Sequence, residues 1–320
     1  MPLLRFLPEA TKINFVGARY FAFAVDGLLL LASILSIAVH GFNLGIEFTG
    51  GVEMEMKYAR QIDLDHVRTQ VAGLGFKDFN IQYVGGGQCD VPANSCMLVH
   101  VQPQTAANQD QANQVAKDKI KAAFKDYTVR NSSVIGPKVS GELFRAGVLA
   151  TLLAVVAIAI WVAVRFEWQY GISAAAATGH DVLVTAGLFS ILHLDFSLTS
   201  IAALLTLAGY SINDTVVVFD RIRENRRKYK RMGLGDLINL STNQMLTRTI
   251  LTSAATATSI IPLLIYGGPT LFDFSASILF GIIVGTFSSI YVAAALLLYL
   301  PAPAGSNIAD VDSNTSDAVA

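Results

Sequence analysis

The residue whose chemistry stands out is Asp214, an acidic side chain inside the apolar stretch GYSINDTVVVF. A charge at the centre of a bilayer costs roughly 2.5–3.5 kcal/mol on insertion scales, so such a residue normally faces a helix bundle or a wet cavity. Tyr210 lies four residues earlier, on the same face of a helix. Gly209 and Ser211 are small enough to let a neighbouring helix approach. The pattern predicts a buried carboxylate that takes up and releases protons; the alternative is a structural polar contact between helices.

A polar stripe in the stretch MLTRTILTSAATATSII is the expected partner of Asp214. Its members fall at steps of four, four and three residues: Arg248, Thr252, Thr256 and Ser259. Burial raises the pKa of a carboxyl group and a nearby arginine lowers it, so movement of an arginine can load or release a proton. The membrane potential supplies about 2.3 kcal/mol per charge per 100 mV to drive such a change.

These considerations assign a role to each polar residue of the predicted site. Asp214 is expected to carry the proton and Arg248 to tune its proton affinity. Asn213, Tyr210 and Thr252 are expected to support the site by hydrogen bonding or by holding water. The predicted chemistry involves protons and no other cofactor, no metal and no covalent nucleophile, so the chain is not expected to be an enzyme.

Three further acidic positions lie in or beside apolar stretches. Asp181, next to His180, is either part of a structural hydrogen-bonded pair or part of the proton relay, and the sequence leaves both open. Asp26 is predicted to be structural. Asp220 lies among arginines, where an interfacial salt bridge is the ordinary explanation.

The composition indicates what positions these residues. Of 320 residues, 53% are hydrophobic and 15% are charged, against about 25% charged in ordinary soluble domains, and the mean hydropathy is +0.50. A membrane-spanning helix needs about 20 mostly apolar residues. Six stretches reach that length: Tyr20–Val39, Ala146–Val164, Gly171–Leu192, Phe196–Phe219, Thr249–Phe272 and Phe274–Leu300. The first is predicted to be a retained signal anchor, because no small-residue cleavage site follows it.

Lysine and arginine near the helix ends predict the orientation. Lys12 and Arg19 precede the first stretch, and the loop RIRENRRKYKR after the fourth holds seven basic residues. Both termini and this basic loop (220–246) are therefore expected in the cytoplasm. The loop is interpreted as a topology determinant near anionic lipid, in preference to a ribosome or nucleic-acid site.

Residues 41–142 form the one large segment expected outside the membrane and away from the cytoplasm. Alternating stretches such as GVEMEMKY predict strands, and two amphipathic stretches predict helices, in the order βαββαβ of a ferredoxin-like domain. Cys89 and Cys96, the only cysteines, could pair in an oxidising compartment; a reduced pair is the alternative, and a metal site would need more ligands. His66 and His100 are expected to be solvated or structural.

Several motifs resemble the SecD/SecF family. FNLGIEFTGG (42–51), with Gly45, Gly50 and Gly51, resembles the family signature GIDFTGG, although Glu47 stands where aspartate is common. VIGPKVSGEL, GHDVLVTAG, LLTLAGYSINDTVVVFDRIREN and RTILTSAATATSIIPL also resemble family motifs, in order and spacing, up to residue 300. The size of the segment 41–142 resembles that of SecF-type members.

The resemblance implies a resistance-nodulation-division (RND) type fold, in which this chain supplies six helices and SecD a related six. It further implies export of unfolded preproteins through the SecYEG channel, assisted by the proton motive force, with SecD and YajC as partners beside membrane lipids and without nucleic acid. The helix 4 aspartate and helix 5 arginine associated with proton coupling in this family correspond to Asp214 and Arg248. The implied location is the bacterial inner membrane.

Two other functions remain open at this point. One is half of an RND-type exporter of small molecules or lipids, and the other is a structural subunit that stabilises SecD without titrating. The predicted organisation is a cytoplasmic N-terminus (1–19), a first helix (20–40), the exported domain (41–142), helices 2–6 (143–300) and a disordered cytoplasmic tail (301–320).

Overall fold

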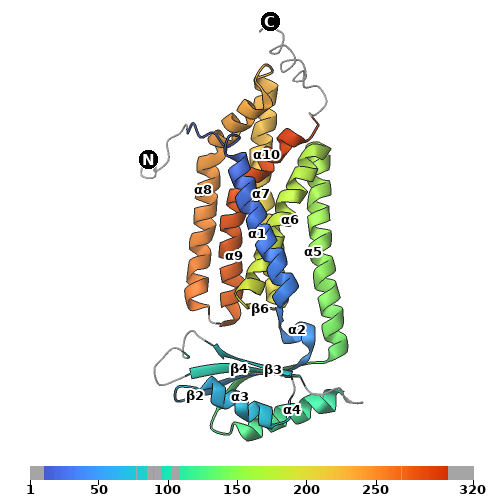
Figure 1. Cartoon of the computed structure of the whole chain (residues 1–320), viewed down its shortest axis with the longest axis vertical. Coiled ribbons are helices and arrows are strands. Elements are labelled where there is room, and N and C mark those ends of the chain that lie inside the picture. Colours follow the sequence, from blue (N-terminus) through green and yellow to red (C-terminus); the bar gives the residue numbers. More distant parts are fainter. Residues whose placement is uncertain are drawn as a thin grey trace.

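The computed structural model describes residues 11–76, 78–84, 89, 95–102, 109–267 and 269–301. The predicted Gly-rich stretch 85–88, most of the loop 89–95 and the predicted tail from residue 302 onward lie outside these ranges. The chain forms a long helix bundle with a small domain of strands and helices at one end, and both described termini lie at the other end (Figure 1).

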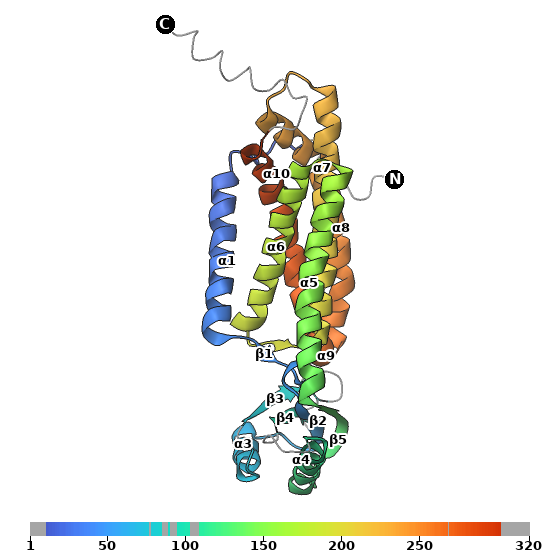
Figure 2. The same ribbon diagram turned by 90° about the vertical axis from the view of Figure 1, so that its right-hand side faces the viewer.

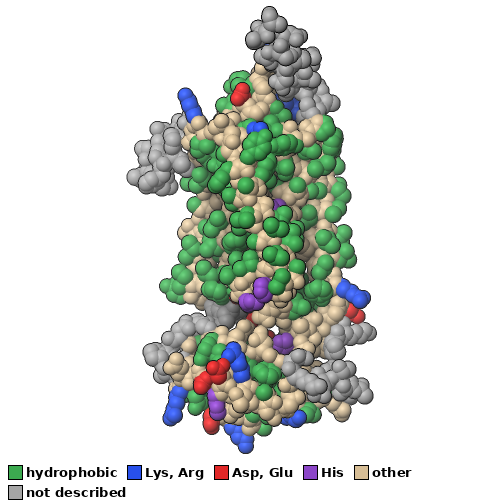
Figure 3. All heavy atoms as spheres, viewed as in Figure 1, with side chains coloured by type: hydrophobic (Ala, Val, Ile, Leu, Met, Phe, Trp, Pro, Cys, Tyr) green, Lys and Arg blue, Asp and Glu red, His purple; other side chains and the backbone are tan. Residues whose placement is uncertain are grey.

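Within the described residues, six helices are long and apolar enough to cross a membrane. Their bounds are α1 Arg19–His40, α5 Pro137–Arg165, α6 Trp168–Ile191, α7 Leu198–Lys228, α8 Leu234–Tyr266 and α9 Pro269–Ser288. The last of these continues through a π-helical turn η2 (Ser289–Ala293), α10 (Ala294–Leu296) and a 3₁₀ turn η3 (Leu297–Tyr299). Hydrophobic side chains cover the bundle surface along its length (Figure 3), as expected for a multi-pass membrane protein.

Several helices extend beyond their apolar stretches. The predicted basic loop 220–246 is mostly helical, because α7 continues to Lys228 and α8 begins at Leu234. Hydropathy detects only the lipid-facing part of a helix, whereas Arg226, Arg227 and Lys228 in the last turn of α7 interact favourably with the helix dipole. In the same way α5 begins at Pro137, a residue suited to the first helical position, well before the apolar stretch at 146.

The helices differ in how much of their surface they bury. In α6, α7 and the last span about half or more of the residues are buried, whereas α1, α5 and α8 expose most of their surface. In Figure 2, α1 runs along one flank, beside α6. The central helices are therefore the ones that can hold polar groups away from lipid.

The small domain follows α1 and consists of six elements. These are β2 Gly51–Tyr58, α3 Leu64–Gly73, β3 Asp78–Val84, β4 Ser95–Gln102, α4 Gln109–Ala123 and β5 Thr128–Ile135. The strands form one antiparallel sheet in the order β3-β4-β2-β5, the ferredoxin-like arrangement predicted from the sequence. Asp63 caps α3, since its carboxylate accepts hydrogen bonds from the backbone N–H groups of Asp65 and His66.

The two faces of this sheet differ in polarity. Val52, Met54 and Met56 of β2 are buried in a core that also includes side chains of α3 and α4. The alternate residues of the same strand, Glu53 and Glu55, project from the opposite face. In Figure 1, α3 and α4 lie below the sheet and the helix bundle lies above it, so the polar face of the sheet points toward the bundle.

The chain passes from α1 into the domain through β1 (Asn43–Leu44) and α2 (Ile46–Thr49). The strand β1 pairs in parallel with β6 (Asp195–Phe196), which lies between α6 and α7. Gly50 and Gly51 follow α2 with φ of 73° and 119°, a backbone conformation that favours glycine. A Cβ on Gly51 would also lie 2.5 Å from the carbonyl oxygen of Val101.

Candidate functional site

Asp214 lies near the middle of α7 and faces α8. Its side chain is 3% exposed, and Oδ2 is buried without a hydrogen-bond partner among the described residues. The hydroxyl groups of Thr252 and Ser253 face its carboxylate, and Arg248 is near enough to act on it electrostatically. The carboxylate therefore has hydroxyl neighbours but no counter-charge in direct contact.

Ser253 connects the surroundings of Asp214 to a third helix. The hydroxyl of Tyr210 donates to Ser253 Oγ at 2.9 Å, and Ser253 Oγ lies 2.7 Å from Thr286 Oγ1 of α9. The sequence analysis missed Ser253 because it followed the stripe that starts at Arg248. The neighbouring stripe of Thr249 and Ser253, four residues apart, is the one buried in the structure, and this spacing could have identified it.

Most side chains of the predicted polar stripe form hydrogen bonds to backbone carbonyls of their own helix, α8. Thr252 Oγ1 donates to the carbonyl of Arg248 at 3.1 Å, Thr256 Oγ1 to that of Thr252, and Ser259 Oγ to that of Thr256. Such bonds satisfy hydroxyl groups inside a membrane helix without a partner helix. Of the predicted stripe, Thr252 is the hydroxyl residue that also acts on Asp214.

Arg248 and Asn213 lie on the exposed side of the site. Among the described ion pairs, none joins Arg248 to Asp214. Arg248 instead lines a cleft of about 480 Å³ between α5, α7 and α8. The other lining residues are Trp161, Arg165, Phe166, Val216, Val217, Asp220, Arg221, Glu224 and Met245. An exposed arginine at this position in a single chain implies that something other than hydrocarbon covers it.

Asp220 is exposed on α7 at the rim of the same cleft. The predicted salt bridge of Asp220 does not occur among the described ion pairs, where Arg221 pairs with Glu224 at 2.6 Å. Arg221 and Glu224 are three residues apart on the same helix face, which favours this pairing.

A second buried acidic group lies deeper, between α1, α6 and α7. Asp181 is fully buried; its Oδ1 is 3.1 Å from His180 Nδ1, and its Oδ2 accepts a hydrogen bond from Ser211 Oγ at 2.5 Å. His180 Nε2 lies 3.3 Å from the backbone oxygen of Asp26. The structure thus places Asp26, which the sequence analysis left without a partner, beside the His180–Asp181 pair.

A third polar group joins the small domain to the helix bundle. The carboxylate of Asp195 in β6 accepts a hydrogen bond from Asn43 Nδ2 at 2.5 Å and another from Gln82 Nε2 of β3. The backbone N–H of Asp195 donates to Asp273 Oδ2 at 3.0 Å. Asp195 therefore contacts β1, the sheet and α9 at the same time.

The polar sheet face beside Asp195 holds two groups with shifted pKa values. Burial raises the pKa of Glu53 to about 7, and the nearby carboxylates of Glu47 and Asp195 act in the same direction. Burial lowers the pKa of His100, although its contact with the Gly50 carbonyl partly opposes the shift. Both shifts favour the neutral form at the junction. His100 thus has neighbours that the sequence analysis did not foresee, whereas His66 is exposed.

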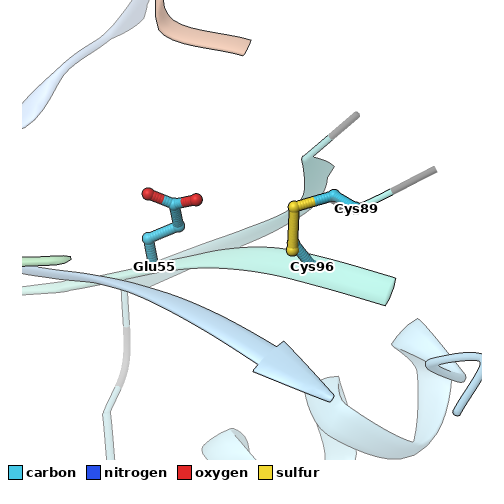
Figure 4. A group of neighbouring side chains, drawn as sticks. All are labelled: Glu55, Cys89 and Cys96. Atoms are coloured by element: carbon cyan, nitrogen blue, oxygen red, sulfur yellow. A yellow bond between two sulfur atoms is a disulfide. The ribbon is translucent and has the colours of Figure 1, made fainter. Parts of the chain in front are cut away.

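Cys89 and Cys96 form a disulfide, beside Glu55 on the polar face of the sheet (Figure 4). Arg130 Nη1 lies 2.7 Å from Glu55 Oε1 and 3.1 Å from Cys89 Sγ. Glu55, Cys89 and Cys96 are close enough to resemble three metal ligands, but a metal binds cysteine as the thiolate. The disulfide therefore acts as a covalent link rather than as a pair of metal ligands. The guanidinium group of Arg130 occupies the position beside Glu55 that a metal ion would need.

The three glycines of the motif 42–51 adopt different conformations in the structure. Gly50 and Gly51 adopt positive φ, whereas Gly45 has an ordinary φ of −65° and its N–H donates to the carbonyl of Phe196 at 2.9 Å. Glu47 lies in the first turn of α2 and acts on the junction through its charge. Gly45 therefore belongs to the β1–β6 pairing rather than to the turn.

Known proteins match this chain over nearly its full length. The family model described as protein export membrane protein SecD/SecF, C-terminal, matches residues 115–302, and the SecD/SecF GG motif matches residues 35–62. The protein translocase subunit SecF of Cereibacter sphaeroides is 38% identical over 316 residues, covering 98% of this chain and 97% of that protein. The protein of the same name from Rhodobacter capsulatus is 39% identical over 304 residues, covering 93% of this chain and 91% of that protein.

Solved structures agree with these matches. The crystal structure of SecDF, a translocon-associated membrane protein from Thermus thermophilus, superimposes with a TM-score of 0.81 at 35% identity. It covers 92% of this chain, which spans 39% of the length of that SecDF chain. SecDF in a super-membrane-facing form gives a TM-score of 0.65 at 36% identity, with 90% of this chain and 39% of that chain covered. The predicted fold class is confirmed, and this chain belongs to the SecD/SecF family of protein-export membrane proteins.

Proposed function

We propose that this chain is the SecF-type subunit of a protein translocase and uses the proton motive force to assist preprotein export. The observation that carries the proposal is Asp214, a buried carboxylate inside the membrane with hydroxyl neighbours and no direct counter-charge. A carboxylate in such a place is stable when neutral and costly when charged. Movement of Arg248 toward it would favour proton release, and movement away would favour proton uptake.

The exposed polar residues beside Asp214 support a protein partner in the membrane. Asn213, Arg248 and Gly209 are exposed in the single chain, and lipid cannot satisfy a guanidinium group at this depth. The matched SecDF chains are more than twice as long as this one. We assign the missing part to a SecD-type partner whose helices cover α7 and α8 and complete the surroundings of Arg248.

The remaining assignments concern the wider assembly. The proposed location is the bacterial inner membrane, with both termini in the cytoplasm and the small domain outside. The SecYEG channel, YajC, unfolded preprotein and anionic lipid at the basic ends of α7 and α8 are the proposed contacts of the complex. These assignments follow from the family and from the distribution of basic residues.

The decisive experiment replaces Asp214 in the complex with SecD. Asp214→Asn keeps the shape and the hydrogen-bonding capacity of the side chain but cannot titrate. We expect export of a secreted precursor to fall by at least tenfold in cells that lack the native protein, with normal membrane levels and normal SecD association. Asp220→Asn is the matched control, because Asp220 is an exposed carboxylate on the same helix, and it should export at the wild-type rate.

The alternatives predict different outcomes. A structural subunit that only stabilises SecD would export at the wild-type rate with Asp214→Asn, and that result would exclude Asp214 as the proton carrier. If the chain were half of a small-molecule or lipid exporter, cells that lack it would export the precursor at the normal rate. Their efflux of the small molecule or lipid would change instead.

A further inference from the structure

The contact between α1 and α6 is narrow and polar. The buried residues of α1 are Ala22, Asp26 and Ser33, which fall on one face at helical spacing. The rest of α1 is largely exposed to the surroundings of the bundle. Asp26 thus lies in the middle of the surface through which α1 attaches to the other helices, which we call the α1–α6 seam.

The α1–α6 seam is tightly packed on the outer side of Asp26. A Cβ on Gly187 would lie 2.2 Å from Ser33 Cβ, so the two helices approach closely there. One turn further, Ser36 Oγ lies 2.9 Å from Ser190 Oγ. These contacts show that α1 and α6 lie in direct contact over the turns that follow Asp26.

Asp26 is 4% exposed, and neither carboxylate oxygen has a hydrogen-bond partner among the described residues. An ionised carboxylate buried in this way would carry the full cost of desolvation. The arrangement in the structure is therefore compatible with a protonated, neutral Asp26. Ionisation would require that the seam open or that a cation approach.

The only ionisable groups that act on Asp26 within the described residues are His180 and Asp181. The turn η2 also packs on α1 and contributes Tyr291, whose ring contacts Phe15 and Phe287. At the start of α1, Arg19 bonds to Tyr20 and Tyr299 instead. Asp26, His180 and Asp181 thus form one group of neighbouring ionisable side chains, in which His180 contacts both the Asp181 carboxylate and the backbone of Asp26.

We propose that Asp26, His180 and Asp181 form a second proton-binding site, whose occupancy controls how tightly α1 packs on α6. Asp181 holds the imidazole of His180, and Ser211 of α7 holds Asp181. With a proton on Asp26 the seam is closed, as in this structure. Loss of that proton places a charge in the seam and favours separation of α1, which leads directly into β1 and the small domain. The proposal does not depend on the role of Asp214.

The test is infrared spectroscopy of the full chain with its partner in lipid nanodiscs, titrated from acidic to alkaline pH. We expect the wild type to show a C=O band of a protonated carboxylic acid at pH values where exposed carboxylates are ionised. Both Asp26 and Asp214 should contribute to this band, and Asp26→Asn should remove one component of it that Asp214→Asn leaves in place. Asp220→Asn should change nothing. A band of unchanged amplitude in Asp26→Asn would overturn the proposal.

A second measurement keeps the proposal testable if Asp26→Asn does not accumulate. His180→Gln removes the imidazole but keeps hydrogen-bonding groups, and it should shift the midpoint at which the Asp26 band disappears. An unchanged midpoint would contradict a shared site. The seam itself is followed with Ser36→Cys and Ser190→Cys, whose cross-linking rate is compared at each pH with that of the same pair in Asp26→Asn, because alkaline pH alone speeds thiol oxidation. We expect the ratio of the two rates to fall as pH rises, and a constant ratio would contradict control of the seam by Asp26.

Discussion

The two acidic sites inside the membrane differ in what surrounds them. The site of Asp181 is complete within this chain, because His180, Ser211 and Asp26 contact or face it from three helices. The site of Asp214 is buried on one side only, and Arg248 and Asn213 beside it are exposed. The comparison indicates that one site is complete within this chain, whereas the other is the one that we propose a second protein completes.

The difference has energetic consequences. Removing one partner of a fully buried ion pair lowers stability strongly, because it leaves the other group buried without a partner. A carboxylate with an unpartnered oxygen contributes less, since its neighbours keep other hydrogen bonds. We therefore expect mutations at the enclosed site to lower stability and mutations at the open site to lower export, and the following predictions test that separation.

The largest effect is expected for Asp181→Ala. It would leave His180 and Ser211 buried without their partner, and we expect the free energy of unfolding to fall by about 3–5 kcal/mol. Asp214→Ala should cost about 1 kcal/mol, because Thr252 and Ser253 retain bonds to other acceptors. Denaturant unfolding of the purified complex measures both values. Equal losses would show that the two sites are not energetically distinct.

The packing of the α1–α6 seam gives the next effect. In Gly187→Ala the new methyl group would meet Ser33 at 2.2 Å, and overpacking of this kind costs about 1–3 kcal/mol. Gly179→Ala is the matched control on the same helix, since nothing lies within 4 Å of its Cβ, and it should be neutral or slightly stabilising. Thermal unfolding distinguishes the two variants. A neutral Gly187→Ala would mean that α1 is not held closely against α6.

At the open site, Tyr210→Phe removes the hydroxyl that donates to Ser253. We expect a loss of about 1 kcal/mol in stability, together with slower export, because Ser253 faces Asp214. Tyr266→Phe is the control, since Tyr266 is 83% exposed at the end of α8. Precursor export and unfolding are measured on the same samples. Normal export in Tyr210→Phe would remove Ser253 from the working site.

The last effect is expected outside the membrane, at the junction, and it depends on pH. Because burial raises the pKa of Glu53 from 4.5 to about 7, the folded state binds more protons than the unfolded state between these values. The stability of the small domain should therefore fall as pH rises from about 4.5 to about 7 and level off above. Glu53→Gln should flatten this dependence, whereas Asp118→Asn, exposed on α4, should leave it in place. A parallel loss of stability with pH in both wild type and Glu53→Gln would contradict this assignment.

The extent to which the sequence predicted these features depended on the range of the interaction. The six helices and the order βαββαβ were predictable because apolar length and alternation are local patterns. The sequence also identified Asp214, because a single carboxylate within an apolar stretch can be recognised without knowledge of the fold. The polar ends of α5, α7 and α8 lie outside the predicted apolar stretches, because polar helical residues carry no hydropathy signal.

Contacts between distant helices could not be predicted. Asp26 meets His180 only because α1 packs on α6, and no local pattern connects them. The buried stripe of α8 was confused with its exposed neighbour because both carry hydroxyl residues four apart. Asp195 was missed altogether, since a single acidic residue in a short loop resembles ordinary solvent-exposed polarity.

The pairing of β1 with β6 has a consequence for biogenesis. All four strands of the small domain lie between Gly51 and Ile135, so this domain can fold before the rest of the chain has been made. Gln82, however, must wait for Asp195, 113 residues later, and β1 must wait for β6. Synthesis proceeds from the N-terminus, and domains generally fold as units. The domain is therefore held by α1 alone until α5 follows it into the membrane, and the contacts through β1 and Gln82 form only after α6 has been made.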